Sequence, residues 1–335
     1  MKIFIPFTIK DIGGPSSFVM KFSQGLKERG HEVSFVETSD YDILFVIVQA
    51  PFDILMRAKL HKKVIVQRLD GVYYWSVAGP LFPLFNLKAL LTYHLFTNHT
   101  VYQSNYSKYC ARRFLFTHRS SPSTIIYNGV DTNVFSPGQT TLSLRDTADQ
   151  AIFFSASAFR RKDQILPLLE ALSFYHDHYN SNFKLVLAGT FTRKLPALLP
   201  TIQSIPWVHI LGKIPNQELP LYERASDIFV FSHLNPPCPN NVIEALACGL
   251  PICGVADGAM PELITSGVEG SLIPVQGHAF WKERSYDTQL FAKNLDSIIK
   301  SQPSLAQQSR SKALEKFSLE KMLDQYEELF KKTLT

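Results

Sequence analysis

Three consecutive cationic residues, Arg160, Arg161 and Lys162, follow a short apolar run and open an amphipathic stretch. At the start of a helix such cations oppose the helix dipole, so a purely structural role is unfavourable there. Guanidinium and ammonium groups hold phosphate oxygens and neutralise their charge without a metal ion. The triplet therefore predicts a binding site for a phosphate or diphosphate, with a solvated basic helix start as the alternative.

A second group of candidates lies in residues 235–251, which read Asn-Pro-Pro-Cys-Pro-Asn-Asn-Val-Ile-Glu-Ala-Leu-Ala-Cys-Gly-Leu-Pro. Asn240 is a suitable N-cap for a helix, and an apolar stripe follows it, formed by Val242, Ile243, Leu246 and Ala247. Glu244 is predicted to point away from this stripe, on the side shared with Asn241 and Cys248. There, a carboxylate can accept hydrogen bonds from a ribose diol. The alternative is an exposed glutamate that the helix dipole favours.

The first third of the chain carries two more candidate groups. Gly13 and Gly14 precede a predicted helix, and close backbone approach together with free helical amides suits an anion or a sugar. Arg68 and Asp70 lie at the end of a strand-like run, and the carboxylate of Asp70 can orient or deprotonate a hydroxyl group. A turn capped by Asp70 before Gly71 is the structural alternative.

These candidates must be positioned by two series of strands and helices. The first half contains six strand-like runs, at residues 2–7, 31–36, 43–48, 64–67, 100–103 and 124–127. The second half contains five more, at residues 152–155, 185–188, 208–211, 228–231 and 251–254. Helical stretches separate them, which indicates right-handed βαβ units and parallel sheets. The polar residues 133–150 indicate a linker between two doubly wound sheets, and ligands bind at the carboxyl ends of such strands.

Length and composition agree with two packed domains. The chain has 335 residues, of which 45% are apolar and 19% charged, and this excludes wholesale disorder. The net charge of +5 is not concentrated in any block, which argues against nucleic-acid binding. The four cysteines are too few and too irregularly spaced for a disulfide framework or a zinc site, so a reducing cytosol is the default.

The most apolar stretch of the sequence is residues 72–96. Polar residues and prolines interrupt it, and no run of about 18 uninterrupted apolar residues exists. We therefore predict no transmembrane helix. The stretch is interpreted as a core helix with its loop, while contact with a membrane surface or an acceptor groove stays open.

Several motifs follow the order found in one enzyme family. Residues 235–251, together with Gly-Ala-Met-Pro-Glu-Leu at 258–263, resemble the donor-site signature of the GT4 family of retaining glycosyltransferases. Gly13-Gly14 resembles the family's amino-terminal glycine loop, and Ile-Tyr-Asn-Gly-Val-Asp at 126–131 resembles the sequence before its second domain. Shorter matches follow in the family's order at residues 186–189, 211–212 and 226–228. The resemblance covers nearly the whole chain.

This resemblance implies the GT-B fold, an α/β architecture of two Rossmann-like, doubly wound parallel-sheet domains that face each other across a cleft. It implies an acceptor-side domain at residues 1–138, a nucleotide-sugar donor domain at 139–315, and a C-terminal helix at 316–335 that packs back on the first domain. It also implies transfer of a sugar from a UDP- or GDP-sugar to a hydroxyl acceptor. The anomeric configuration would be retained, and no metal or other cofactor would be required.

The resemblance also implies roles for individual residues. A glutamate of the family's donor signature binds the ribose hydroxyls, and Glu244 matches it. The family places an arginine and a lysine at the diphosphate, which implies Arg160 or Arg161 together with Lys162. These cations would stabilise the charge that develops on the leaving group.

The sequence departs from the family at the sugar-binding position. The first acid of the family's motif would stand at Pro236. Contacts with the transferred sugar must therefore come from elsewhere, and Asn235, Asn240 and the amides at the helix start are candidates, with Asn241 beside them. On the acceptor side, many relatives carry a histidine or an aspartate near Gln67, which leaves Asp70 and Arg68 as the polar candidates. Arg68 is also a predicted donor-binding residue.

Two alternatives stay open. A sugar-nucleotide 2-epimerase of the same fold would need general acid and base carboxylates, which we cannot place in this sequence. A non-catalytic sugar-nucleotide-binding protein is motivated by Pro236. The acceptor expected from the family is a polysaccharide or a lipid-linked glycan. The expected location is the cytoplasm, and the mild basic charge together with residues 72–96 permits peripheral contact at the inner face of a membrane.

Overall fold

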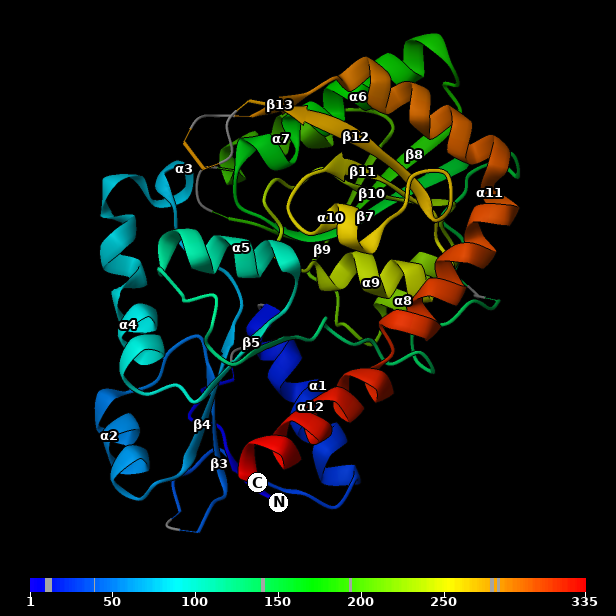
Figure 1. The fold of residues 1–335 in the computed structure, drawn as a ribbon. Helices are drawn as coiled ribbons and strands as arrows, with labels where there is room; N and C mark the ends of the chain where they lie inside the picture. The colour runs from blue at the N-terminus through cyan, green and yellow to red at the C-terminus, as the bar shows by residue number, and fades with distance from the viewer. Residues whose placement is uncertain (10–13, 39, 140–141, 193–194, 278–279, 282–283) are drawn as a thin grey trace. The chain divides into compact units, whose positions relative to one another are not determined.

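The computed structural model describes the chain except for residues 10–13, 39, 140–141, 193–194, 278–279 and 282–283 (Figure 1). The chain divides into two compact units. Unit 1 comprises Met1–Gly129, His278–Glu283 and Leu319–Thr335, and unit 2 comprises Val130–Gly277 and Arg284–Ser318. Each unit has its own parallel sheet and its own hydrophobic core.

The boundary between the units lies earlier than the sequence predicted. The sequence placed it after residue 138, whereas the first segment of unit 1 ends at Gly129. Val130 forms a parallel bridge with Ser318, and Arg310 donates a hydrogen bond to the carbonyl of Thr132 at 3.0 Å. These long-range contacts tie the residues after Gly129 to unit 2. The polar composition from which we predicted the linker carries no information about them.

The described residues of unit 1 form a sheet of six parallel strands in the order β2-β1-β3-β4-β5-β6. The strands are β1 (Lys2–Phe4), β2 (Glu32–Ser34), β3 (Ile43–Ile47), β4 (Val64–Leu69), β5 (His99–Tyr102) and β6 (Ser123–Ile125). The helices are α1 (Gly14–Glu28), α2 (Phe52–Leu60), α3 (Trp75–Ala78), α4 (Phe82–Leu95), α5 (Asn105–Phe114) and α12 (Leu319–Leu334). Every residue of β3 is buried, as its continuous apolar sequence requires for a strand covered on both faces.

The last helix, α12, packs against α1 within unit 1. The rings of Phe22 and Tyr326 meet edge to face with their centroids 4.7 Å apart. Gly25 lies so close to Leu323 that a Cβ there would stand 2.4 Å from the leucine Cδ1. The sequence predicted a returning helix at residues 316–335. The returning segment begins slightly later, at residue 319.

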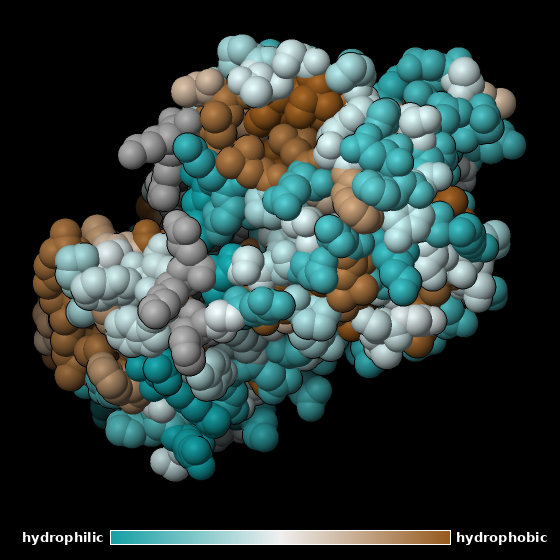
Figure 2. Space-filling model, turned by 90° about the horizontal axis from the view of Figure 1, so that it is seen from above, coloured by the Kyte–Doolittle hydropathy of each residue, from teal (hydrophilic) through white to brown (hydrophobic). Residues whose placement is uncertain are grey.

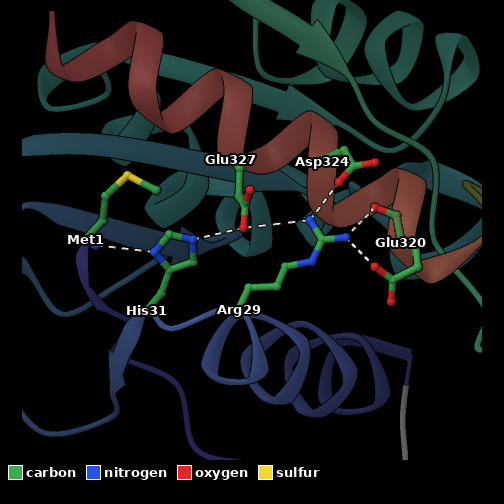
Figure 3. A network of polar contacts seen from close by, with 6 residues as sticks. All are labelled: Met1, Arg29, His31, Glu320, Asp324 and Glu327. Atoms are coloured by element: carbon green, nitrogen blue, oxygen red, sulfur yellow. Dashed lines mark hydrogen bonds and ion pairs between the residues drawn. The ribbon is translucent and has the colours of Figure 1, made fainter.

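Polar contacts also join the residues that follow α1 to α12 (Figure 3). Arg29 follows α1 and donates to Asp324 at 2.7 Å, and it also pairs with Glu320. The Nε2 atom of His31 lies 2.9 Å from a carboxylate oxygen of Glu327. The C-terminal segment is therefore an integral part of unit 1.

The described residues of unit 2 form a seven-stranded sheet in the order β13-β12-β11-β10-β7-β8-β9. The strands are β7 (Ala151–Phe159), β8 (Phe183–Phe191), β9 (Val208–Gly212), β10 (Ile228–Phe231), β11 (Ile252–Ala256), β12 (Gly270–Gln276) and β13 (Ser285–Tyr286). The helices are α6 (Leu166–His178), α7 (Leu199–Gln203), α8 (Leu219–Arg224), α9 (Asn240–Ala247), α10 (Met260–Leu263) and α11 (Thr288–Lys316). Only β13 runs antiparallel to its neighbour.

The two series of predicted strands and the parallel sheets are confirmed, with β12 and β13 missed by the sequence analysis. Strand β12 begins with Gly270 and contains Pro274, two residue types that weaken a strand signal. The described residues within 133–150 form neither a helix nor a strand, in agreement with the predicted irregular segment.

Residues 72–96 contain α4, a helix of 14 residues. Over the described part of the chain, we find no helix with the length and apolar character needed to cross a bilayer.

Candidate functional site

The carboxyl ends of three neighbouring strands of unit 2 bring the predicted donor-side residues to one edge of the sheet. Strand β10 lies between β7 and β11 and pairs in parallel with both. Arg160 follows β7 directly, residues 232–235 follow β10, and Asp257 follows β11. Since parallel strands end at the same edge, the cations and the start of α9 share this edge, which is where ligands bind in doubly wound sheets.

The cation loop, residues 160–162, contains one engaged and two available cations. Arg161 donates from Nε to Asp163 at 2.9 Å and makes a second bond from Nη2, so its guanidinium is held by its own carboxylate. Arg160 and Lys162 are exposed, and neither has an ion pair with any described residue. The sequence left open which arginine faces an anion. The geometry favours Arg160 together with Lys162.

A buried polar network supports the cation loop from below. The side-chain carbonyl of Gln164 accepts hydrogen bonds from the main-chain N–H groups of Arg160 and Arg161 at 2.6 and 3.0 Å. The Nε2 of Gln164 lies 3.2 Å from Nδ1 of His233, and the Ser232 hydroxyl donates to the Gln164 main-chain carbonyl at 2.7 Å. The loop after β7 is thus tied to the loop after β10.

His233 is a neutral member of this network. Burial, reinforced by the nearby charges of Arg160 and Arg161, lowers the pKa of His233 to about 3. Because Gln164 donates to Nδ1, the ring proton resides on Nε2, an atom that is buried without a hydrogen-bond partner among the described residues. A neutral imidazole at this position avoids adding a third charge next to the two arginines.

Helix α9 starts differently from the prediction. Asn240 was expected to be the N-cap, but the helix begins at Asn240 and the residue before it, Pro239, takes the cap position with an extended backbone and no side-chain cap. Proline has no side-chain acceptor, so the start of α9 lacks the hydrogen bond that an asparagine at the cap position would accept. The Oδ1 atom of Asn240 is buried and has no hydrogen-bond partner among the described residues. Asn241 donates to the carbonyl of Ala156 at 2.6 Å and so ties α9 to β7.

Glu244 is buried, with only 3% of its surface exposed, although it was predicted to face away from the apolar stripe. Both sides of α9 are covered, which removes the alternative of a solvated glutamate. On α8, Glu223 is 1% exposed. Burial, followed by the charge of Glu244, raises the pKa of Glu223 well above its ordinary value. The shift favours the protonated form of Glu223, which lessens the repulsion between the two carboxyl groups.

The sequence analysis missed a buried polar cluster of Asn235, Asp257 and Arg284. Arg284 Nη1 lies 2.6 Å from Asp257 Oδ1 and donates to Asn235 Oδ1 at 3.1 Å. The main-chain N–H of Asn235 donates to Asp257 Oδ2 at 2.6 Å. The side chains of Arg284 and Asp257 are 10% and 6% exposed. Asp257 lies three residues after the predicted strand at 251–254, which is a usable signal, whereas nothing around Arg284 in the sequence indicates its role.

This cluster fixes the backbone at the position where the family's acid is replaced. Asn235 adopts a left-handed conformation with φ of 58°, which asparagine tolerates better than most residues. Next to it, Pro236 packs against Gly258, where a Cβ would stand 2.4 Å from the proline ring. Residues 235 and 236 are therefore held in one backbone path by contacts on both sides.

In unit 1, Arg68 is an internal residue. It lies in β4, is 1% exposed, and forms an ion pair with Asp70. It also donates to Asn128 at 2.6 Å and to Gln103 at 3.3 Å, and its guanidinium carbon lies 3.6 Å from the ring centroid of Phe18. We predicted Arg68 as a donor contact. Its burial and its partners Asp70, Gln103 and Asn128 make it a support for Asp70 instead, while its Nε is buried without a hydrogen-bond partner among the described residues.

Asp70 and the glycine pair complete the predicted residues of unit 1. Burial raises the pKa of Asp70 above its ordinary value, and the Arg68 guanidinium counteracts this. Gly14 opens α1, and a Cβ on it would meet no atom within 4 Å. Packing therefore does not require a glycine there. Gly13 lies outside the described residues.

Among the residues that the structure describes, no group of three or more His, Cys, Asp or Glu side chains could hold a metal ion. Cys110, Cys238, Cys248 and Cys253 are free and buried.

Comparison with known proteins identifies unit 2. A family model described as "Glycosyl transferases group 1" matches residues 149–300, the stretch that holds the cation loop, α9 and the Asn235–Asp257–Arg284 cluster. Residues 149–300 of the chain are therefore similar to this family. The resemblance to GT4 glycosyltransferases that the motifs indicated is thereby confirmed.

Two curated proteins are similar in sequence to parts of this chain. Alpha-monoglucosyldiacylglycerol synthase of Acholeplasma laidlawii is 25% identical over 123 residues, which cover 36% of this chain and 31% of that protein. N-acetyl-alpha-D-glucosaminyl L-malate synthase of Bacillus anthracis is 23% identical over 211 residues, which cover 61% of this chain and 52% of that protein. The matched region thus spans less than two thirds of either relative.

A solved structure matches the whole chain. Anabaena Alr3699/HepE in complex with UDP and glucose superposes with a TM-score of 0.76 at 16% identity, covering 98% of this chain and 99% of that one. At this identity the likeness shows the fold. The predicted α/β fold class, two Rossmann-like parallel-sheet units of the GT-B type, is confirmed.

Proposed function

We propose that this chain is a retaining glycosyltransferase that moves a sugar from a nucleotide-diphosphate sugar to a hydroxyl acceptor. The observation that carries the proposal is the pair of exposed cations without an acidic partner, Arg160 and Lys162, at the carboxyl edge of a sheet whose sequence matches the glycosyl transferases group 1 model. The solved structures of Anabaena HepE contain UDP, which makes UDP the first nucleotide to test here, with GDP as the second.

In this proposal each donor-side residue has one task. Arg160 and Lys162 bind the diphosphate and stabilise the charge that develops on it as the sugar leaves. Glu244, at the first turns of α9, accepts hydrogen bonds from the ribose hydroxyls. Asn240, whose buried Oδ1 lacks a partner among the described residues, and the held backbone of Asn235 meet the sugar, in place of the acid that Pro236 replaces.

The reaction itself needs no nucleophile from the protein. The bond between the anomeric carbon and the phosphate oxygen breaks, the acceptor oxygen bonds to the same face of that carbon, and the departing phosphate takes the acceptor proton. The protein supplies positioning and charge stabilisation. Asp70, supported by Arg68, orients the acceptor hydroxyl. Since the diphosphate charge is met by Arg160 and Lys162, we expect activity without a divalent metal.

The proposed acceptor is a glycan or a lipid-linked glycan. One relative is named for the synthesis of a glycosyl diacylglycerol, which supports an acceptor at a lipid surface. We accordingly propose a cytoplasmic location with peripheral attachment to a membrane.

A thermal-shift screen with UDP, GDP and their common sugar conjugates tests the donor site, with NAD as the negative control. At 100 times its Kd a ligand adds about 2.7 kcal/mol to the free energy of unfolding, which is easily measured. We expect a shift with one nucleotide family, of equal size in EDTA and in magnesium. A folded protein that responds to no nucleotide diphosphate would contradict the proposal. Conversion of the donor to an epimer without acceptor would favour the epimerase, and binding without any transfer would favour a binding protein.

Glu244→Ala tests the ribose assignment. The loss of hydrogen bonds to a charged acceptor, worth about 1.5–3 kcal/mol, should raise the Kd of UDP by about tenfold or more in calorimetric titrations. Glu315→Ala, which changes an exposed glutamate of α11, is the matched control and should bind UDP like the unchanged chain. Equal affinity of both variants would refute the assignment.

A further inference from the structure

Helix α4 of unit 1 has its polarity reversed relative to an ordinary surface helix. Its buried residues are Asn86, Ala89, Thr92 and Tyr93. Its exposed residues include Leu84, Phe85, Leu87, Leu91 and Leu95, which we call the outer face of α4 and whose exposed fractions are 66%, 54%, 46%, 38% and 47%. A helix normally turns its apolar side to the core. The reversal indicates that an apolar phase other than the core of unit 1 covers the outer face.

The inner side of α4 shows that the reversal is built in. The side chain of Asn86 donates to the carbonyl of Tyr73 and accepts from its N–H, both at 2.8 Å. These two hydrogen bonds fix the rotation of the helix about its axis. The side chains of the outer face cannot turn toward the core without leaving Asn86 without its hydrogen-bond partners. In Figure 2, hydrophobic side chains gather along the left edge of the molecule, the side on which Figure 1 shows α4.

Exposed residues on both sides of the outer face extend it. Tyr73 and Trp75 precede α4 and are 48% and 44% exposed, and the Tyr73 ring lies 5.3 Å from that of Phe85. Beyond the other end of α4, Leu60 of α2 is 73% exposed, and Lys59 donates to the carbonyl of Leu95 at 2.7 Å. Amphipathic aromatic rings beside an apolar face are typical of the headgroup region of a bilayer.

The charge around this face has a single sign. Between Asp70 and Asp131 the sequence contains no aspartate or glutamate, while it contains Lys88, Lys108, Arg112, Arg113 and Arg119. Lys88, Arg113 and Arg119 are exposed. A nearby acid on α2, Asp53, is paired with Arg57. An apolar face with a cationic surround complements a surface that is apolar inside and anionic outside.

This charge pattern separates a membrane from a second copy of the chain as the occupant. In a two-fold contact between copies, the same patch meets itself. Cations without acids would then face each other, which is unfavourable. A polar pocket of about 180 Å³ at the C-terminal end of α4, lined by His94, Asn98, His118 and Ser121 among others, offers room for polar headgroup atoms.

We propose that unit 1 docks on a bilayer containing anionic lipid, with the outer face of α4 inserted at the headgroup–acyl boundary and Tyr73 and Trp75 at the headgroup level. This inference rests on the proposed function, because it specifies which surface of the chain would make the proposed peripheral contact with a membrane. Its physical basis uses no residue of the donor site. Vesicle binding and nucleotide binding are therefore measured independently.

Co-sedimentation with vesicles tests this docking. The chain should bind vesicles of phosphatidylcholine mixed with phosphatidylglycerol, bind phosphatidylcholine alone much more weakly, and dissociate as salt is raised. The double variant Leu84→Glu, Phe85→Glu should lower the partition coefficient by at least about tenfold, because two apolar side chains that would insert into the bilayer are lost and two anions are added. Lys88→Gln should lower it by about fivefold, since each cation near an anionic surface contributes about 1 kcal/mol.

A matched control is Leu314→Glu, which changes an exposed leucine of α11, 46% exposed, and should leave vesicle binding unchanged. Since the exchanged side chains are exposed, all variants should keep the unfolding temperature and the UDP response of the unchanged chain. Vesicle binding that survives the double substitution would overturn the proposal. So would a dimer, seen by light scattering, that the double variant abolishes in a chain that does not bind vesicles.

Discussion

Two arginines stand at the carboxyl edges of the two sheets and have opposite environments. Arg68, in β4 of unit 1, is 1% exposed and is bonded to Asp70, Gln103 and Asn128. Arg160, after β7 of unit 2, is exposed and has no ion pair with any described residue. The residue type and the position in the fold are alike. The partners that the chain provides distinguish a structural arginine from one that is available to a ligand.

Electrostatics explains this difference. A buried guanidinium must be paired and hydrogen-bonded, because its desolvation is otherwise prohibitive. A solvated cation pays little desolvation energy when no ligand is bound. Its attraction to a bound diphosphate is strongest where little water surrounds the two charges. We therefore expect substitution of Arg68 to change the stability of the fold and substitution of Arg160 to change binding.

Arg68→Ala should have the largest effect. Removing one partner of a buried ion pair leaves Asp70 uncompensated and should lower the free energy of unfolding of unit 1 by about 3–5 kcal/mol. Urea denaturation followed by tryptophan fluorescence measures it. Arg57→Ala, which removes an exposed ion-paired arginine of the same unit, is the control and should unfold like the unchanged chain. If Arg68→Ala lowered the free energy of unfolding only slightly, Arg68 would not be the structural arginine that we contrast with Arg160.

The double variant Arg160→Ala, Lys162→Ala should come next. It should keep the unfolding transition and weaken UDP binding by about a hundredfold, since two charge-assisted contacts to the diphosphate are lost. Uridine, which has no phosphate, should bind both proteins equally in calorimetric titrations. An equal loss for uridine would show that the substitutions disturb the nucleoside site and not the diphosphate site.

His233 provides a pH test of the network under the cation loop. Its pKa is about 3 in the folded chain and about 6.5 in an unfolded one. Between these values the unfolded chain binds more protons, so this contribution to stability is complete above about pH 6.5 and is lost as the pH falls toward 3. The slope is at most about 1.4 kcal/mol per pH unit. His233→Gln should reduce the slope of unfolding free energy against pH, while His61→Gln, at an exposed histidine, should not.

The smallest effect is expected for Arg161→Ala. Its guanidinium is bound to Asp163, and partly exposed pairs of this kind contribute about 0–1 kcal/mol. UDP affinity should change by less than about threefold, far less than for Arg160→Ala measured alongside. Equal losses for Arg160→Ala and Arg161→Ala would show that a bound diphosphate displaces Asp163, and the loop would then act as one unit.

Local patterns allowed the sequence analysis to predict much of the fold and part of the candidate site. Continuous apolar runs such as residues 43–47 predicted buried parallel strands, and the alternation with helices predicted two doubly wound sheets. The motif in 235–251 indicated the family through its residue types and spacing alone, while the donor-binding roles of its residues stay a prediction. Strand β12 was missed since Gly270 and Pro274 obscure its pattern.

Long-range partners account for the other failures. Arg284 meets Asp257 and Asn235 through contacts between residues far apart in the sequence, and no local pattern encodes such a meeting. The unit boundary moved for the same reason, because the bridge from Val130 to Ser318 is a tertiary contact.

The sequence alone determined the chemistry on offer: three adjacent cations after a strand, a glutamate in a helix start, an acid-free apolar stretch and two α/β halves. The tertiary structure decided which of these groups are free to act. It paired Arg161 with Asp163 and left Arg160 without an acid, and it buried Arg68 and Glu244. It also turned the leucines of α4 outward. Whether a side chain is available to a ligand depends on its burial and its partners, which residues distant in the chain provide. Residue type and spacing, in contrast, can be read from a short segment of the sequence.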